Sequence, residues 1–199
     1  AKCRSLAAGL LLNYTTRAFI SGSVTGSLAD NTPLAKKLPF PVTVSDAAST
    51  YMQKYDYETA CGTNGKPYFK DHANLYFNLS HSGNFAVCIV AGMPCGIDVE
   101  GNRPFKPSVA KRFFSETEYH WIYDTENVSV QAERFFRLWT LKEAYAKATG
   151  NGIAAEIHAA SYVPDTDSDG LCFADSETAA HFQIKEAEYD RLRIAAVLS

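Results

Sequence analysis

Residues 95–100 read Cys95-Gly96-Ile97-Asp98-Val99-Glu100. Acidic and apolar residues alternate in this stretch, and successive side chains of a β-strand point to opposite faces. The alternation therefore predicts a strand that presents the carboxylates of Asp98 and Glu100 on one face. A solvent-facing strand at the surface would show the same two acids, so this stretch alone leaves both interpretations open.

A third acid lies in Trp139-Thr140-Leu141-Lys142-Glu143-Ala144-Tyr145-Ala146-Lys147. The pattern predicts a helix over about 131–149 that ends at Gly150-Asn151-Gly152. Glu143 follows Trp139 by four residues, so a helix places both on one face. A carboxylate on an apolar face is costly unless a positive charge compensates it, and a pair with Lys147 is the ordinary explanation.

The three acids Asp98, Glu100 and Glu143 would form a site of hard oxygen ligands if they converged. Such a site suits Mg²⁺ holding a phosphate-bearing substrate.

The composition describes an ordinary globular protein. The 199 residues are 46% hydrophobic and 21% charged, which fits one domain or two small domains packed together. The formal net charge of −3 gives no indication of a nucleic-acid partner or of an anionic membrane. The sequence shows no transmembrane run and no signal peptide. Five widely spaced cysteines without a Cys-x-x-Cys pair disfavour a zinc site or a disulfide framework and indicate a reducing cytoplasm.

The remaining elements follow an order of helix, strands, helices and strands, without strict βαβ alternation, which predicts an α+β fold. We expect a first helix over about 3–20 and a loop-rich stretch over 21–49. Gly92-Met93-Pro94 is expected to join the strands 85–90 and 96–100 as a hairpin. Ser115 opens a capping box with Glu118. Further predicted strands are 68–69, 75–79, 153–163, 170–173, 179–185 and 192–198, with a further helix at 107–114.

Ser80-His81-Ser82-Gly83 lies between two predicted strands and suits a tight turn. Its hydroxyl and imidazole groups could also donate hydrogen bonds to a phosphate, with Gly83 allowing a ligand to approach closely. A Ser/His/Asp hydrolase is disfavoured, because adjacent Ser and His residues in a turn do not form a nucleophile elbow. Lys66 is a surface turn lysine on its own, and Glu118 serves its capping box or acts as a second base near the metal.

Taken in order, five motifs resemble the 4′-phosphopantetheinyl transferases of the surfactin-synthetase type. The resemblance is strong over about 61–153, moderate over 1–20 and 153–199, and poor over 21–60. The motifs are Gly65-Lys66-Pro67, Phe77-Asn78-Leu79-Ser80-His81-Ser82-Gly83, Gly96-Ile97-Asp98-Val99-Glu100, Arg112-Phe113-Phe114-Ser115 with Glu118, and Trp139-Thr140-Leu141-Lys142-Glu143-Ala144 with Lys147.

The resemblance implies two similar α+β halves packed as an intramolecular pseudo-dimer, with coenzyme A bound between them. Residues 1–95 would form the N-terminal half, with an incomplete start, and residues 96–199 the C-terminal half that carries the metal site. The implied reaction moves the 4′-phosphopantetheine arm of coenzyme A to a serine of an apo acyl or peptidyl carrier protein and releases 3′,5′-ADP. Mg²⁺ is the implied cofactor.

Matched position by position, Asp98, Glu100 and Glu143 take the metal-ligand places. Glu143 is the first choice for the catalytic base and Glu118 the second. The residues expected to contact coenzyme A are Lys2, Arg4, Lys66, Pro67, Ser80, His81, Lys142 and Lys147.

The chain departs from the family pattern at its start, where the N-terminal strand region is absent and a loop-rich stretch replaces a shorter connection before Gly65. We expect a preceding segment to be missing. Two other functions stay open from the residues: a Mg²⁺-dependent nucleotide pyrophosphohydrolase and a catalytically inactive coenzyme A-binding domain. We expect a cytoplasmic monomer. The candidates for the carrier-binding surface are Phe105, Phe113, Phe114, Lys111 and Arg112.

Overall fold

The computed structural model describes residues 8–16, 57–101 and 103–199, and the following statements concern these residues. Of the first predicted helix, residues 8–16 are helical. The predicted loop-rich stretch over 21–49, together with Lys2 and Arg4, lies outside the described residues. Within the part of the chain that is described, no helix has both the length and the apolar character needed to cross a membrane.

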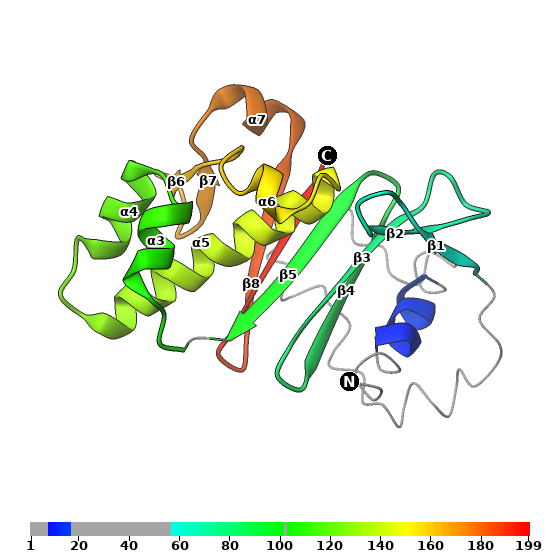
Figure 1. Ribbon diagram of the computed structural model, residues 1–199, viewed down its shortest axis with the longest axis horizontal. Helices are drawn as coiled ribbons and strands as arrows, with labels where there is room; N and C mark the ends of the chain where they lie inside the picture. Colours follow the sequence, from blue (N-terminus) through cyan, green and yellow to red (C-terminus); the bar gives the residue numbers. More distant parts are fainter. Residues whose placement is uncertain (1–7, 17–56, 102) are drawn as a thin grey trace.

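The strands form small antiparallel sheets (Figure 1). Two hairpins, β1–β2 and β3–β4, come first along the chain, and a sheet of order β5-β9-β8 and the β6–β7 pair follow. The strands are β1 (Thr59–Cys61), β2 (Pro67–Phe69), β3 (Tyr76–Ser82), β4 (Phe85–Ala91), β5 (Cys95–Gly101), β6 (Tyr162–Pro164), β7 (Leu171–Phe173), β8 (Gln183–Tyr189) and β9 (Leu192–Leu198).

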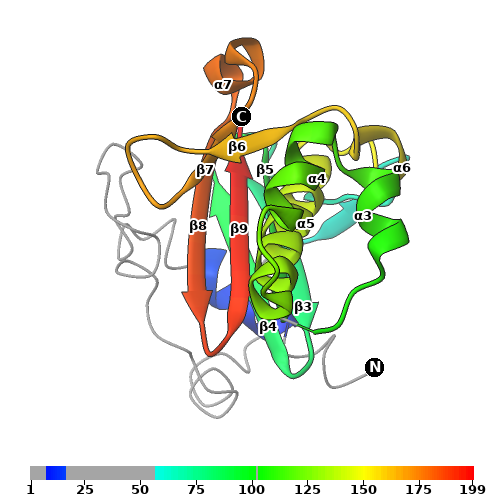
Figure 2. The same ribbon diagram turned by 90° about the vertical axis from the view of Figure 1, so that its left-hand side faces the viewer.

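One long helix, α5 (Val128–Thr149), lies along one face of the β5-β9-β8 sheet (Figures 1 and 2). It ends where Gly150 adopts a left-handed conformation with φ of 77°, as the sequence predicts. The shorter helices are α3 (Pro107–Phe113), α4 (Glu116–Tyr123), α6 (Ile153–Glu156) and α7 (Ser176–His181). The predicted capping box of Ser115 and Glu118 opens α4 and is confirmed.

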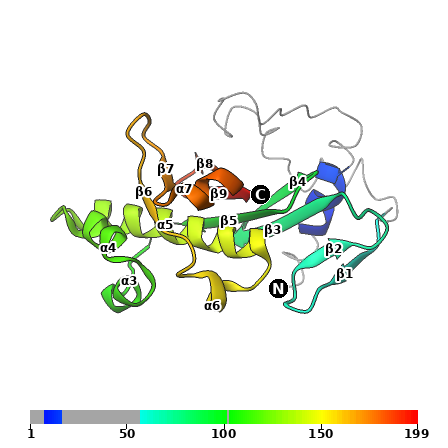
Figure 3. The same ribbon diagram turned by 90° about the horizontal axis from the view of Figure 1, so that it is seen from above.

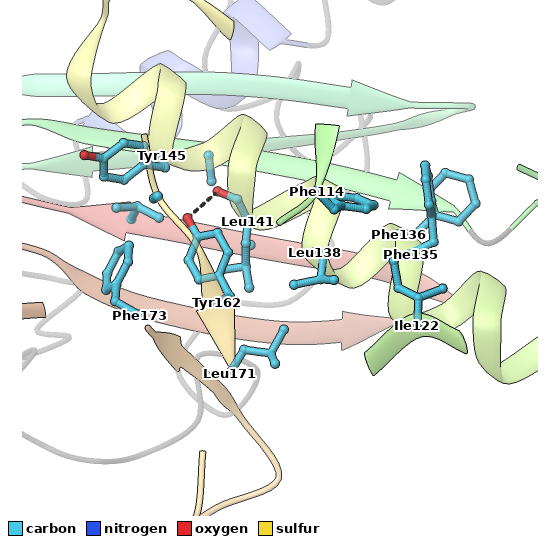
Figure 4. Close-up of a cluster of buried hydrophobic side chains, with 14 of the residues drawn as sticks. Phe114, Ile122, Phe135, Phe136, Leu138, Leu141, Tyr145, Tyr162, Leu171 and Phe173 are labelled. Carbon is cyan, nitrogen blue, oxygen red and sulfur yellow. Dashed lines mark hydrogen bonds between the residues drawn. The ribbon is translucent and has the colours of Figure 1, made fainter. Parts of the chain in front are cut away.

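The main core lies around α5 (Figure 4). Leu138 and Leu141 of the helix are fully buried there, and the Leu141 carbonyl accepts a hydrogen bond of 3.3 Å from the Tyr162 hydroxyl. The opposite face of the sheet is apolar as well. Ile97 and Ile194 belong to a buried cluster there, against which Val87 of β4 packs. Strand β5 is therefore covered on both faces.

The mixed α and β class is confirmed, but three local predictions are wrong. Strands β4 and β5 do not form a hairpin, because β4 pairs with β3 and β5 pairs with β9. Ser80, His81 and Ser82 belong to strand β3, and the turn begins at Gly83, whose φ is 57°. The predicted strands 153–163 and 179–185 begin instead with the short helices α6 and α7.

The helical starts of these two segments have local causes. Asp175 caps α7, since its side chain accepts a hydrogen bond from the Thr178 amide. Gly152, with φ of 87°, turns the chain directly into α6.

Candidate active site

The three predicted acids approach one another where α5 crosses β5. Burial raises the pKa of Glu143, and the charges of Asp98 and Glu100 raise it further, while Lys147 lowers it. Lys147, one turn after Glu143 on α5, donates a hydrogen bond of 2.6 Å to Asp98 on β5, so this part of the helix lies directly beside the strand that carries the other two acids. The helix and the strand therefore bring together the acids that lie more than forty positions apart in the sequence.

Asp98 is the most buried of the three, with 4% of its surface exposed. Its Oδ1 accepts hydrogen bonds from Lys147 Nζ at 2.6 Å and from Ser80 Oγ at 2.7 Å. Its Oδ2 is buried and has no hydrogen-bond partner among the described residues. Burial raises the pKa of Asp98, and the charge and hydrogen bond of Lys147 oppose this shift.

The other two acids differ in their partners. Glu100 receives two hydrogen bonds from the guanidinium of Arg103, at 2.7 Å and 3.3 Å. The same guanidinium lies over the ring of Phe136. Glu143, by contrast, makes no hydrogen bond or ion pair with any residue that the structure describes. Within the described part of the chain, the Glu143 carboxylate is thus the one of the three that no hydrogen bond or ion pair engages.

As the side chains stand, the described residues contain no group of three or more His, Cys, Asp or Glu that could hold a metal ion. Lys147 and Arg103 occupy oxygens of Asp98 and Glu100. The donor set nevertheless fits Mg²⁺, which prefers carboxylate oxygens. Asp98 Oδ2 and the Glu143 carboxylate, which have no hydrogen-bond partner among the described residues, are oxygens that a cation would satisfy.

Two of the expected coenzyme A-contacting residues lie in this cluster. Ser80 bonds Asp98, and Lys147 Nζ bonds Ser80 Oγ at 3.2 Å and the Ile97 carbonyl at 3.3 Å. His81 is exposed and follows Ser80 on β3, so its side chain points to the other face of that strand.

Lys66 is placed differently from the expectation. Its ammonium donates hydrogen bonds to the Cys95 carbonyl at 3.1 Å and to the Ala148 carbonyl, in the last turn of α5, at 2.8 Å. Burial lowers its pKa. Lys66 therefore joins the turn before β2 to the carboxyl end of α5, an arrangement that stabilises a helix terminus. Pro67 begins β2 directly after it.

Glu118 and Lys142 do not join the acid cluster, and we correct both assignments. Their side chains are 0% and 1% exposed and pair with each other at 3.1 Å. Lys142 also donates to the carbonyls of Ile157 and Ala160. All three hydrogens of its ammonium therefore have acceptors, which does not agree with a coenzyme A contact. The oxygens of Glu118 accept from the Ser115 and Tyr162 amides as well as pairing with Lys142, which does not agree with a base function.

The structure adds two residues that the sequence reasoning did not single out. Arg103 forms an ion pair with Glu100. Its position three residues after that acid is the feature of the sequence that indicates the pair. Asn78 accepts a buried hydrogen bond from the Ile97 amide at 3.0 Å. Its signal was the period of two that it shares with Ser80 and Ser82 on one strand.

Residues 94–197, which include Asp98, Glu100, Glu143 and Lys147, match the family model of the 4′-phosphopantetheinyl transferase superfamily. The chain belongs to this superfamily. It is 35% identical over 106 residues to 4′-phosphopantetheinyl transferase Sfp of Bacillus subtilis (strain 168), which covers 53% of this chain and 47% of that protein. It is 47% identical over 107 residues to 4′-phosphopantetheinyl transferase HetI of Nostoc sp., which covers 51% of this chain and 43% of that protein.

The chain spans about half the length, or less, of most of the curated relatives it matches. Among solved structures, it matches the holo-[acyl-carrier-protein] synthase of Thermotoga maritima with a TM-score of 0.42 and 21% identity, over 53% of this chain and 62% of that one. The relatives do not favour a pyrophosphohydrolase or an inactive binding domain as alternatives.

Proposed function

We propose that this protein transfers the 4′-phosphopantetheine arm of coenzyme A to a serine of an apo carrier protein and releases 3′,5′-ADP. One observation carries the proposal. Asp98, Glu100 and Glu143 gather with Lys147 and Ser80 beside α5, and four of these five residues lie inside the segment that matches the superfamily.

Mg²⁺ would be held by Asp98, Glu100 and Glu143, and when bound it would offset the charge that develops as a phosphoanhydride breaks. The ammonium of Lys147, which bonds Asp98 in this structure, would then turn to phosphate oxygens of coenzyme A. The Ser80 hydroxyl lies 2.7 Å from Asp98 and would orient the same phosphates.

In the reaction, the carrier's serine oxygen forms a bond to the phosphorus that bears the pantetheine arm. The bond from that phosphorus to the oxygen of the 3′,5′-ADP leaving group breaks. Glu143 would accept the serine proton, because its carboxylate has no competing partner among the described residues and burial raises its pKa. Asp98 is held by Lys147 and Ser80, which makes it the better ligand and the poorer base.

The direct test incubates the purified protein with coenzyme A, Mg²⁺ and a panel of apo carrier proteins. We expect at least one carrier to gain the mass of phosphopantetheine. Absence of this gain across fatty-acid, polyketide and nonribosomal-peptide carriers would overturn the proposal.

Replacing Glu143 with Gln should lower kcat/KM by about 10²-fold or more, because it removes both a ligand and the proposed base. The fold should persist, since this carboxylate supports no hydrogen bond among the described residues. Steady-state transfer rates and circular dichroism measure the two effects. Glu133→Gln on the same helix is the matched control, since Glu133 pairs with Arg193 instead. Equal activities in the two variants would remove Glu143 from the mechanism.

The carrier would dock on α3, whose exposed face is basic. Lys111 and Arg112 are exposed, whereas Phe114 is buried and Phe105 stacks on Phe135 in the core at 4.3 Å. Two of the aromatic candidates therefore serve the core. Phe113 is half-buried beside Arg112, which lies over its ring.

Charge reversal of Lys111 and Arg112 to Glu should raise the KM for an acidic carrier by about tenfold and leave the KM for coenzyme A unchanged, because surface charges steer association. Kinetics at two salt concentrations measure this effect. Lys70→Glu, on an exposed lysine after β2, is the control. A parallel rise in both KM values would contradict docking on α3.

We further propose that the two halves meet between β4 and β5 as a pseudo-dimer within one cytoplasmic monomer. Backbone pairing supports this boundary, since β1 to β4 pair among themselves and β5 to β9 pair among themselves. The described cysteines are free, as a reducing compartment requires, and burial raises the pKa of the Cys95 thiol to about 12.

A further inference from the structure

Strands β3 and β5 run side by side, although they belong to different sheets (Figures 1 and 3). The hydrogen bonds that join them use side chains of β3. These side chains belong to alternate residues, Asn78, Ser80 and Ser82, which point to one face of the strand. These bonds run from the Ile97 amide to Asn78 Oδ1 at 3.0 Å, from Ser80 Oγ to Asp98 Oδ1 at 2.7 Å, and from Ser82 Oγ to Glu100 Oε2 at 3.5 Å.

The hydrogen bond with Asn78 supplies an acceptor for a backbone amide on the edge of β5 that faces away from β9. In an antiparallel pair, a residue whose amide is not bonded to the partner strand turns both backbone groups outward. Ile97 is such a residue, since its amide donates to Asn78 and its carbonyl accepts from Lys147. An outward amide at a buried edge is costly if it lacks an acceptor, so Asn78 supplies what a neighbouring strand would otherwise provide.

Asn78 differs from the other residues along the β3–β5 seam, the line of contact at which Asn78, Ser80 and Ser82 of β3 bond residues of β5. Its hydrogen bond with the Ile97 amide lies in the interior, whereas the bonds from Ser80 and Ser82 to the two acids are only partly buried. Ser80, Asp98 and Lys147 would exchange partners when Mg²⁺ and coenzyme A bind. The bond between Asn78 and Ile97 involves none of their side chains, so it can persist while those contacts change.

We propose that Asn78 is a positioning residue that holds β3 in register with β5 and thereby keeps Ser80 directed at Asp98. The inference rests on the proposed function, because Asp98 is taken as a ligand of Mg²⁺. Residues that orient metal ligands typically change metal affinity or activity by about 10–100-fold when they are replaced.

Asn78→Leu removes the acceptor at nearly constant side-chain size. We expect it to raise the Mg²⁺ concentration for half-maximal transfer by about tenfold or more and to lower kcat/KM by about 10–100-fold. The matched control is Phe77→Leu on the same strand. It removes the aromatic packing of Phe77 against Phe69 and leaves the hydrogen bonds between β3 and β5 in place. The control should lose thermal stability and keep its Mg²⁺ requirement. Equal changes of the Mg²⁺ requirement in both variants would overturn the inference.

Amide hydrogen exchange at Ile97 provides a readout that does not depend on activity. The amide should be protected in the parent protein and in Phe77→Leu, and should exchange at least about tenfold faster in Asn78→Leu. Unchanged exchange at Ile97 in Asn78→Leu would overturn the positioning role. A parent protein that modifies no carrier would instead overturn the proposed function, and the exchange measurement would still decide whether Asn78 holds the two strands together.

Discussion

Lys142→Met is expected to lower the free energy of unfolding by about 3–5 kcal/mol, because it leaves the carboxylate of Glu118 buried without its positive partner. The two side chains are 1% and 0% exposed, so water cannot replace the lost contact. The substitution also removes the donor from the carbonyls of Ile157 and Ala160, at 3.0 Å and 2.7 Å. Urea unfolding followed by circular dichroism measures the loss.

The double variant Lys142→Met with Glu118→Gln separates the charge from the packing. The Ser115 and Tyr162 amides bond different oxygens of Glu118, Oε2 at 2.7 Å and Oε1 at 3.0 Å, and Gln keeps an acceptor for only one of them. With no buried charge left, part of the lost stability should return. Lys70→Met, in an exposed pair with Glu58, should leave the unfolding midpoint unchanged. If Glu118→Gln lowered the free energy of unfolding of the Lys142→Met variant further, by as much as Lys142→Met lowers that of the parent, the buried charge would not be the cause.

The contrast between Lys142 and Lys147 shows how much of the site follows from the sequence. Both lysines lie on the same predicted helix, and Lys147 shares a face with Glu143 because the two are four residues apart. Lys142 lies five residues before Lys147, which is about 140° around the helix. The helical period therefore predicts that only one of these lysines faces the acids. Motif matching alone assigned both to coenzyme A, and the structure places Lys142 in the interior.

Short-range sequence patterns predict where helices begin and end, but they do not predict which strands pair with each other. The capping box at Ser115 and the left-handed Gly150 depend on residues a few positions apart. The partner of β5 is a strand almost a hundred positions later, Leu192–Leu198. Alternation in 95–100 indicates which face the acids occupy, but it does not indicate which strand pairs with the edge. The short apolar runs at 153–163 and 179–185 suit a helix or a strand equally by pattern.

Gly96→Ala is expected to destabilise the protein by about 3 kcal/mol or more and to abolish the convergence of the acids. A Cβ at this position would lie 2.1 Å from the Ala144 carbonyl oxygen and 2.4 Å from the Ala148 amide nitrogen. Both atoms belong to the backbone of α5, so no side-chain rotation relieves the clash and the helix must move away from β5. Overpacking of this kind typically costs about 1–3 kcal/mol, and a rigid backbone neighbour places it at the upper end or beyond.

A displaced helix would carry Glu143 and Lys147 away from Asp98, whose oxygen lies only 2.6 Å from Lys147 Nζ. Transfer activity should therefore fall further than the fraction of unfolded protein explains, when both are measured at a temperature where the variant is folded. Gly92→Ala, just before the same strand, is the matched control, since a Cβ added there would meet nothing within 4 Å. It should change the free energy of unfolding by no more than about 0.5 kcal/mol. Parent-like stability and activity in Gly96→Ala would mean that α5 does not rest directly on β5, and the close approach that brings the three acids together would have to be abandoned.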